Sequence, residues 1–283
     1  MKRLYTKTVN ESPDLIKAYS NQIPTKHQRD IPVTELRCFY NILKFFSSNT
    51  QLNISEDFNR KGNFKNLCKI YNDSKKHFSK AYDNSNESFL GNNPEIRKQI
   101  PTIPEILKST LDATTFFESV DIVPVDNNKH LDFIYVEREV STIRTTKSIF
   151  NSGKSGKSSG TGGLDFIGLN SNDRLPILGE VKIDSDKNAF YALIQLLTYL
   201  SEIITASQIK RINNYNLFGK DVECNENTKF YLYIILTELK GEHERIFSET
   251  IKLAENLKMG ILDIQNIVFL KLDKKTKKIN QIS

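Results

Sequence analysis

Two carboxylates and one amine interrupt two neighbouring apolar segments near the middle of the chain. Glu180 and Lys182 lie within Leu175–Ile183, and Asp165 lies one apolar segment earlier. Side chains alternate between the two faces of a β-strand, so Glu180 and Lys182 share a face if this segment is a strand. Charged groups in an apolar strand are costly unless they are paired or bound to a metal ion. These three residues are therefore the first candidates for a functional site.

The residues between the two segments predict a hairpin. Asn170–Arg174 has the composition of a turn. If the hairpin is antiparallel and centred on Asn172 and Asp173, residues whose numbers sum to 345 oppose each other, and Asp165 faces Glu180. Directly opposed residues have Cβ atoms about 4.5–5.5 Å apart, a separation that one cation can bridge with both carboxylates. A register shift of one residue would put the two acids on opposite faces.

Two carboxylates beside a lysine suit the hydrolysis of a phosphodiester bond. Oxygen ligands favour Mg²⁺, which keeps several waters and also contacts a substrate phosphate. Bound Mg²⁺ polarises the phosphoryl oxygen, lowers the pKa of a bound water and offsets the charge on the leaving group. Lys182 shares the face of Glu180, so its ammonium can orient that water or stabilise charge that develops on phosphorus. The sequence therefore predicts a metal-dependent phosphodiesterase.

The segments around these residues alternate between helical and strand-like patterns. Apolar residues recur at helical spacing before and after a group of short apolar segments. In chain order the expected elements are a helix at Pro101–Val120, β-type segments at Asp121–Val125, Leu131–Thr145, Gly163–Leu169 and Leu175–Ile183, a helix at Asn188–Ala206, a strand at Phe230–Leu236, a helix at about Ile246–Leu257 and a strand at Ile267–Leu272. Apolar strands that alternate with helices favour an α/β fold with a sheet buried on both faces.

The site residues and this element order resemble the PD-(D/E)XK, or restriction-endonuclease-like, nuclease superfamily. The motif is similar to Asp165, a gap of fourteen residues and then Glu180-Val181-Lys182, with Leu164 in the place of the usual proline. The resemblance covers roughly residues 101–240. It implies an α/β fold with an αβββαβ core, in which a mixed central sheet is flanked by helices. It also implies that Asp165, Glu180 and the Val181 carbonyl hold Mg²⁺, for which Mn²⁺ can substitute, and that Lys182 acts on the nucleophile.

The resemblance extends to the helix that follows the lysine strand. Gln195 and Tyr199 are similar to the Q-x-x-x-Y element of the RecB-like branch, and Gln195 would then support the catalytic residues. At positions i and i+4 the two side chains share a helical face, so both can point at the site. An acid from the first helix often completes such a site. The candidates are Glu105 and Glu118 in that helix and Glu139 in the strand after it.

Two further motifs do not support a second site. Glu238-Leu239-Lys240 repeats the Glu-x-Lys tripeptide, but a polar loop precedes it where an acid-bearing strand is needed. Ser152–Ser158 contains Gly-Lys-Ser twice, but it lacks the earlier glycine of a nucleotide-binding loop and leads into a strand instead of a helix. We interpret this second segment as a basic loop that closes on the DNA backbone or as a plain connector; the wider basic stretch Arg144–Gly163 resembles archaeal Holliday-junction resolvases.

The charge distribution separates an N-terminal region from the rest of the chain. Residues 1–100 contain 17 Lys and Arg against 10 Asp and Glu, whereas the whole chain carries a net charge of +6. Val33–Phe46 and Phe64–Tyr82 have helical patterns, and Ser47–Gly62 between them is polar and turn-rich. Asn84–Pro94 has the composition of a linker. We therefore expect a basic, mainly helical region at 1–98, for nucleic acid or a partner, and a nuclease domain at 99–283.

The remaining features exclude several protein classes. No apolar run reaches the roughly 18 residues of a membrane helix, and no apolar stretch follows the basic N-terminus as in a secretory signal. We therefore expect a cytoplasmic protein with no membrane contact. Cys38, Cys68 and Cys224 are odd in number and widely spaced, which supports neither a disulfide framework nor a zinc site.

The function hypothesis is a Mg²⁺-dependent DNA endonuclease of restriction or antiphage-defence type, acting as a homodimer or with a defence-system partner protein. A second hypothesis is a Holliday-junction-resolvase-like nuclease of repair or recombination. A third is a catalytically silent module of the same fold that only binds nucleic acid. The complete set of Asp165, Glu180 and Lys182 argues against the third, because drift in a silent copy would remove at least one of them.

Overall fold

A six-stranded mixed sheet forms the centre of the computed structural model. The structure describes residues 6–7, 31–32, 34–60, 62–83, 121–140, 164–183, 188–214, 216–237, 239, 241–273 and 275–283. The strands are β3 (Phe133–Val140), β4 (Leu164–Asn170), β5 (Pro176–Lys182), β6 (Phe230–Leu236), β7 (Ile264–Leu272) and β8 (Ile279–Gln281), and they lie in this order across the sheet. A separate pair joins β1 (Thr6–Lys7) to β2 (Ile31–Pro32).

The sheet combines an antiparallel half with a parallel centre. β3, β4 and β5 are antiparallel neighbours, β6 and β7 continue from β5 in parallel, and β8 is antiparallel to β7. β6 (FYLYIIL) is buried along its whole length, as expected for a parallel strand covered on both faces. Two strands differ from the predicted elements: β7 begins three residues earlier than predicted, and β8 follows the last predicted strand. The α/β class is confirmed.

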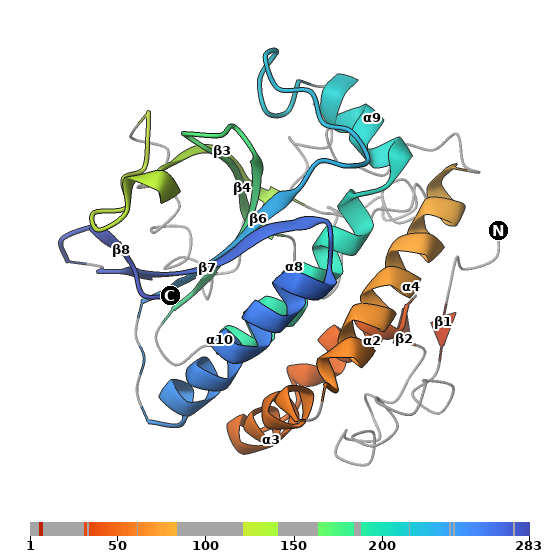
Figure 1. Ribbon diagram of the computed structural model, residues 1–283, viewed down its shortest axis with the longest axis vertical. Coiled ribbons are helices and arrows are strands. Elements are labelled where there is room, and N and C mark those ends of the chain that lie inside the picture. The colour runs from red at the N-terminus through yellow and green to blue at the C-terminus, as the bar shows by residue number, and fades with distance from the viewer. Residues whose placement is uncertain are drawn as a thin grey trace, which may run out of the picture.

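Helices form two layers on one face of the sheet (Figure 1). They are α2 (Glu35–Leu43), α3 (Ser48–Asn59), α4 (Phe64–Asp83), α8 (Ala189–Ile203), α9 (Ala206–Asn214) and α10 (Glu242–Gly260). α8 and α10 pack on the strands, and α2, α3 and α4 pack on α8 and α10 from the outer side. The opposite face of the sheet is covered by the segment around Val123, Val125 and the short 3₁₀ turn η4 (Lys129–Leu131).

α8 is the central helix, and other elements enclose it on all sides. Every residue from Ala189 to Ile203 is buried, which is the pattern of a helix enclosed by other elements. Its N-terminus is fixed by the Asn188 side chain, which accepts a hydrogen bond from the Tyr191 backbone N–H at 2.9 Å. No single helix among the described residues is both long and apolar enough to cross a membrane; α8 taken together with the C-terminal part of α9 meets the composition requirement only as a bent pair.

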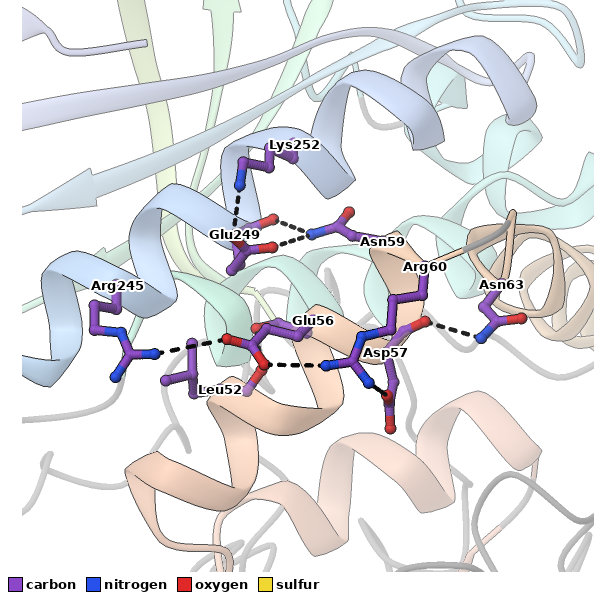
Figure 2. Close-up of polar contacts among 10 residues, drawn as sticks. Leu52, Glu56, Asp57, Asn59, Arg60, Asn63, Arg245, Glu249 and Lys252 are labelled. Carbon is purple, nitrogen blue, oxygen red and sulfur yellow. Dashed lines mark hydrogen bonds and ion pairs between the residues drawn. The ribbon is translucent and has the colours of Figure 1, made fainter.

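The N-terminal helices share one hydrophobic core with the sheet. Buried residues of α2, α3 and α4 belong to the same cluster as those of α8, β6 and α10. Figure 2 shows polar contacts between α3 and α10, where Asn59 Nδ2 donates to the Glu249 backbone oxygen and to its Oε2, both at 2.9 Å. The predicted linker Asn84–Pro94 and the predicted helix Pro101–Val120 lie outside the described residues.

One prediction for the N-terminal region is wrong. Ser47–Gly62, expected to be turn-rich, contains the helix α3, which the Ser47 side chain caps by accepting from the Thr50 N–H at 3.2 Å. Leu52, Ile54 and Phe58 are its buried apolar residues. Such sparse apolar residues give little helical signal in the sequence, and packing against α10 stabilises the helix instead.

Gly179 of β5 is needed because it pairs with Phe166 of β4, whose ring lies over it. A Cβ atom at this position would lie 2.0 Å from the Phe166 ring. That ring is fully buried and stacks on Phe133 with ring centroids 5.6 Å apart, so it cannot move aside easily. We expect Gly179→Ala to lower the free energy of unfolding by about 1–3 kcal/mol, the usual cost of overpacking a core. Chemical denaturation measures this change, and an unaltered unfolding midpoint would contradict it.

Candidate active site

The β4–β5 hairpin has the predicted register. Phe166 pairs with Gly179 and Ile167 with Leu178, so the numbers of paired residues sum to 345 as expected. The same register continued by one residue puts Asp165 opposite Glu180. The Val181 N–H donates to Asp165 Oδ2 at 2.8 Å, which holds the aspartate against β5. The two acids are the residues next to the last pair of this ladder, and they are close enough for the charge of Asp165 to raise the pKa of Glu180.

Glu180, Lys182 and Gln195 form a closed ring of hydrogen bonds. Lys182 Nζ donates to Glu180 Oε2 at 2.7 Å and to Gln195 Oε1 at 3.0 Å, and Gln195 Nε2 donates to Glu180 Oε1 at 2.7 Å. Glu180 and Lys182 come from one face of β5, and Gln195 reaches them from α8, which packs on that strand. Only one orientation of the Gln195 amide satisfies both neighbours, so the ring fixes all three side chains.

Burial dominates the electrostatics of this ring. Glu180 is fully buried, and this burial raises its pKa well above the ordinary value; the charge of Asp165 raises the pKa further, and Lys182 opposes both effects. For Lys182, burial lowers the pKa, but the carboxylates of Glu180 and Asp165 outweigh it and leave the pKa raised. Lys182 is therefore an ammonium that favours the ionised form of Glu180, whereas burial and Asp165 disfavour it. A bound cation would favour the ionised form of both acids.

The donor atoms fit a hard divalent cation. Asp165 is only partly buried, Glu180 lies opposite it, and both supply carboxylate oxygens. The N–H and C=O of one residue in a strand point to the same side, so the Val181 carbonyl faces the Asp165 side of β5. Within the described ranges no group of three or more His, Cys, Asp and Glu side chains gathers around a metal position. Mg²⁺ would accordingly take waters or phosphate oxygens as its other ligands, as it commonly does.

The structure leaves the third acid open. Glu105 and Glu118 lie outside the described residues, and of Glu139 only the backbone, in β3, is described. Ser152–Ser158 also lies outside the described residues, as do Glu238 and Lys240 of the second Glu-x-Lys tripeptide.

Two tyrosines near the site, Tyr191 and Tyr40, were not anticipated. Tyr199 packs against α2, with its ring centroid 6.0 Å from that of Tyr40 and 5.4 Å from the Arg37 guanidinium carbon. The centroid of the Tyr191 ring lies 5.6 Å from Lys182 Nζ. Tyr191 precedes Gln195 by four residues, so the helical spacing used for Tyr199 also identifies it. Tyr40 belongs to α2, and nothing in the sequence connects it with this site.

Comparison with protein-family models, with curated proteins and with solved structures finds no match for this chain. The function must therefore be inferred from the chemistry of the site. Asp165 and Glu180 lie on adjacent strands, and Lys182 is held as an ammonium between Glu180 and Gln195. Such an arrangement can bind a cation and an anionic substrate together.

Proposed function

We propose that the chain is a metal-dependent nuclease that hydrolyses DNA phosphodiester bonds at a PD-(D/E)XK-type site. The observation that carries this proposal is the opposition of Asp165 and Glu180 across β4 and β5, with Lys182 bonded to Glu180. The order β3, β4, β5, α8, β6, with β6 parallel to β5, agrees with an αβββαβ core after its first helix. We propose an endonuclease of restriction or antiphage-defence type.

Each residue of the site has a separate role in this proposal. Asp165, Glu180 and the Val181 carbonyl would hold Mg²⁺ or Mn²⁺, which when bound polarises the phosphoryl oxygen and acidifies a water ligand. Lys182 would stabilise negative charge that develops on phosphorus or orient the nucleophile. Two of its three N–H donors go to Glu180 and Gln195, which leaves the third for a water or a phosphate oxygen.

Purified protein is expected to cut or nick DNA with Mg²⁺ or Mn²⁺ and to stop when EDTA is added. Lys182→Ala should reduce the rate by about 10²–10³-fold, the usual effect of removing one stabilising donor. Lys252→Ala is the matched control, because this exposed lysine pairs with Glu249 on α10 (Figure 2). A panel of duplex, four-way junction and single-stranded DNA and of RNA measures cleavage and its substrate preference.

The panel of nucleic-acid substrates distinguishes the proposed endonuclease from its two alternatives. Preferential cutting of the four-way junction would favour the Holliday-junction-resolvase-like alternative. Binding without cleavage of any substrate, with either metal, would favour the silent nucleic-acid-binding module. If Lys182→Ala cuts as fast as the parent protein, the site assignment is wrong.

A further inference from the structure

Three tyrosines connect the candidate site with the N-terminal helices. Tyr191 and Tyr199 lie on α8, Tyr40 lies on α2, and all three are buried. The Tyr40 ring centroid is 5.4 Å from that of Tyr191 and 6.0 Å from that of Tyr199. Burial raises the pKa of Tyr40, and hydrogen bonding with the side chains of Tyr191 and Tyr199 acts in the opposite direction. A side chain from the N-terminal region therefore fixes two side chains of the central helix.

Tyr191 is the member of this cluster that contacts Lys182 of the candidate site. Lys182 Nζ lies 5.6 Å from the centroid of the Tyr191 ring, within the range in which an ammonium is attracted to an aromatic face. Tyr191 belongs to the first turn of α8, directly after the Asn188 cap. The ring of Tyr191 therefore lies between Lys182 on one side and the Tyr40 ring of α2 on the other.

Tyr40 is itself held in place by a buried charge. The Arg37 guanidinium carbon lies 5.8 Å from the Tyr40 ring and 5.4 Å from the Tyr199 ring, and the Arg37 side chain is paired with Glu202. Arg37 and Tyr40 are one turn apart on α2, so the helix presents both to α8. The buried pair of Arg37 and Glu202 thus holds α2, and with it Tyr40, against α8.

We propose that Tyr40 is a positioning residue for Lys182, acting through the hydroxyl and ring of Tyr191. On this view the N-terminal helix α2 completes the catalytic site, and residues 1–98 are more than a module for nucleic acid or a partner. The proposal rests on the proposed nuclease function for its kinetic consequences, but the placement of the Lys182 ammonium can be measured without any activity.

The kinetic test uses substitutions that remove only a hydroxyl. Tyr40→Phe is expected to lower the single-turnover cleavage rate about tenfold, less than the ~10²-fold that an ångström-scale misplacement can cost, and to leave DNA affinity unchanged. Tyr191→Phe should give a similar loss, and the double variant should lose little more, because both substitutions break one connection. Tyr71→Phe is the control: its hydroxyl, in the same helical layer, donates to Asp263 Oδ2 at 2.8 Å.

The second readout is the NMR signal of the Lys182 ammonium side chain, assigned by its loss in Lys182→Ala. Tyr40→Phe is expected to shift this signal, because the aromatic ring above the ammonium changes orientation, and Tyr71→Phe is expected to leave it in place. An unshifted signal in Tyr40→Phe, or kinetics that match Tyr71→Phe, would overturn the proposal. A shifted signal in a protein that cuts no substrate would support the link from Tyr40 to Lys182 and overturn the proposed function instead.

Discussion

Asp165→Asn is expected to abolish Mg²⁺-dependent cleavage and at the same time to raise the thermal stability of the metal-free protein. The asparagine oxygen can still accept the Val181 N–H bond of 2.8 Å, so the hairpin is preserved. The substitution removes a negatively charged ligand, and we expect the cleavage rate to fall by at least about 10²-fold. It also removes a charge that repels Glu180, and stability should therefore increase.

The pH dependence of stability tests the same argument. Burial and then the Asp165 charge raise the pKa of Glu180 in the folded protein above its unfolded value. The stability that this group contributes is complete below the ordinary carboxyl pKa of about 4.3 and is lost as the pH rises through the raised folded pKa. The metal-free parent should thus lose stability as the pH rises above this value, and Asp165→Asn should lose less.

Added Mg²⁺ separates a metal site from a merely unfavourable pair of acids. A ligand that binds only the folded state raises its stability, so Mg²⁺ should raise the Tm of the parent protein but not of Asp165→Asn. Asp173→Asn is a matched control, because this exposed acid of the same hairpin pairs with the Tyr231 hydroxyl at 2.8 Å, away from the site. Thermal unfolding at several pH values with and without Mg²⁺ measures all three proteins. A parent Tm that does not respond to Mg²⁺ would contradict the cation site.

The hairpin was predictable from the sequence because local patterns alone determine it. The turn composition of Asn170–Arg174 fixes the centre, and strand alternation then fixes which side chains share a face. A register shifted by one residue would put Asp165 and Glu180 on opposite faces of the sheet. The structure shows that register, with Leu178 in the core cluster on the helical side and Val181 in the cluster on the other side.

The role of the N-terminal helices was not predictable, because it depends on contacts between distant parts of the chain. Arg37 and Glu202 are 165 residues apart, and neither belongs to a motif that would indicate burial. Tyr40 is one of eleven tyrosines, and its position beside Tyr191 follows only from the packing of α2 on α8. The net positive charge of residues 1–100 indicated a separate basic region, whereas the buried faces of α2, α3 and α4 join the common core.

Arg37→Ala is expected to lower the free energy of unfolding by about 3–5 kcal/mol, because it would remove the positive charge that neutralises the buried Glu202 carboxylate. Arg37 Nε and Nη2 donate to the two oxygens of Glu202 at 2.6 and 2.5 Å, and both side chains are almost completely buried. Chemical denaturation measures the loss. Arg60→Ala is the control, since this exposed arginine pairs with Glu56 and Asp57 on α3 and should contribute no more than about 1 kcal/mol (Figure 2).

The double variant Arg37→Met with Glu202→Met tests whether the Arg37–Glu202 pair stabilises the fold only because each charge neutralises the other. Removing both charges avoids an unpaired buried group, so most of the lost stability should return. If it does not return, the pair stabilises the packing of α2 on α8 by more than charge neutralisation. If Arg37→Ala behaves like Arg60→Ala, α2 is not held on α8 by this pair. The expected result also bears on truncation: deleting residues 1–98 would remove α2, α3 and α4, uncover α8 and take away the Arg37 charge that neutralises Glu202. A DNA-binding role for this region is therefore better tested with charge changes at exposed lysines than by deletion.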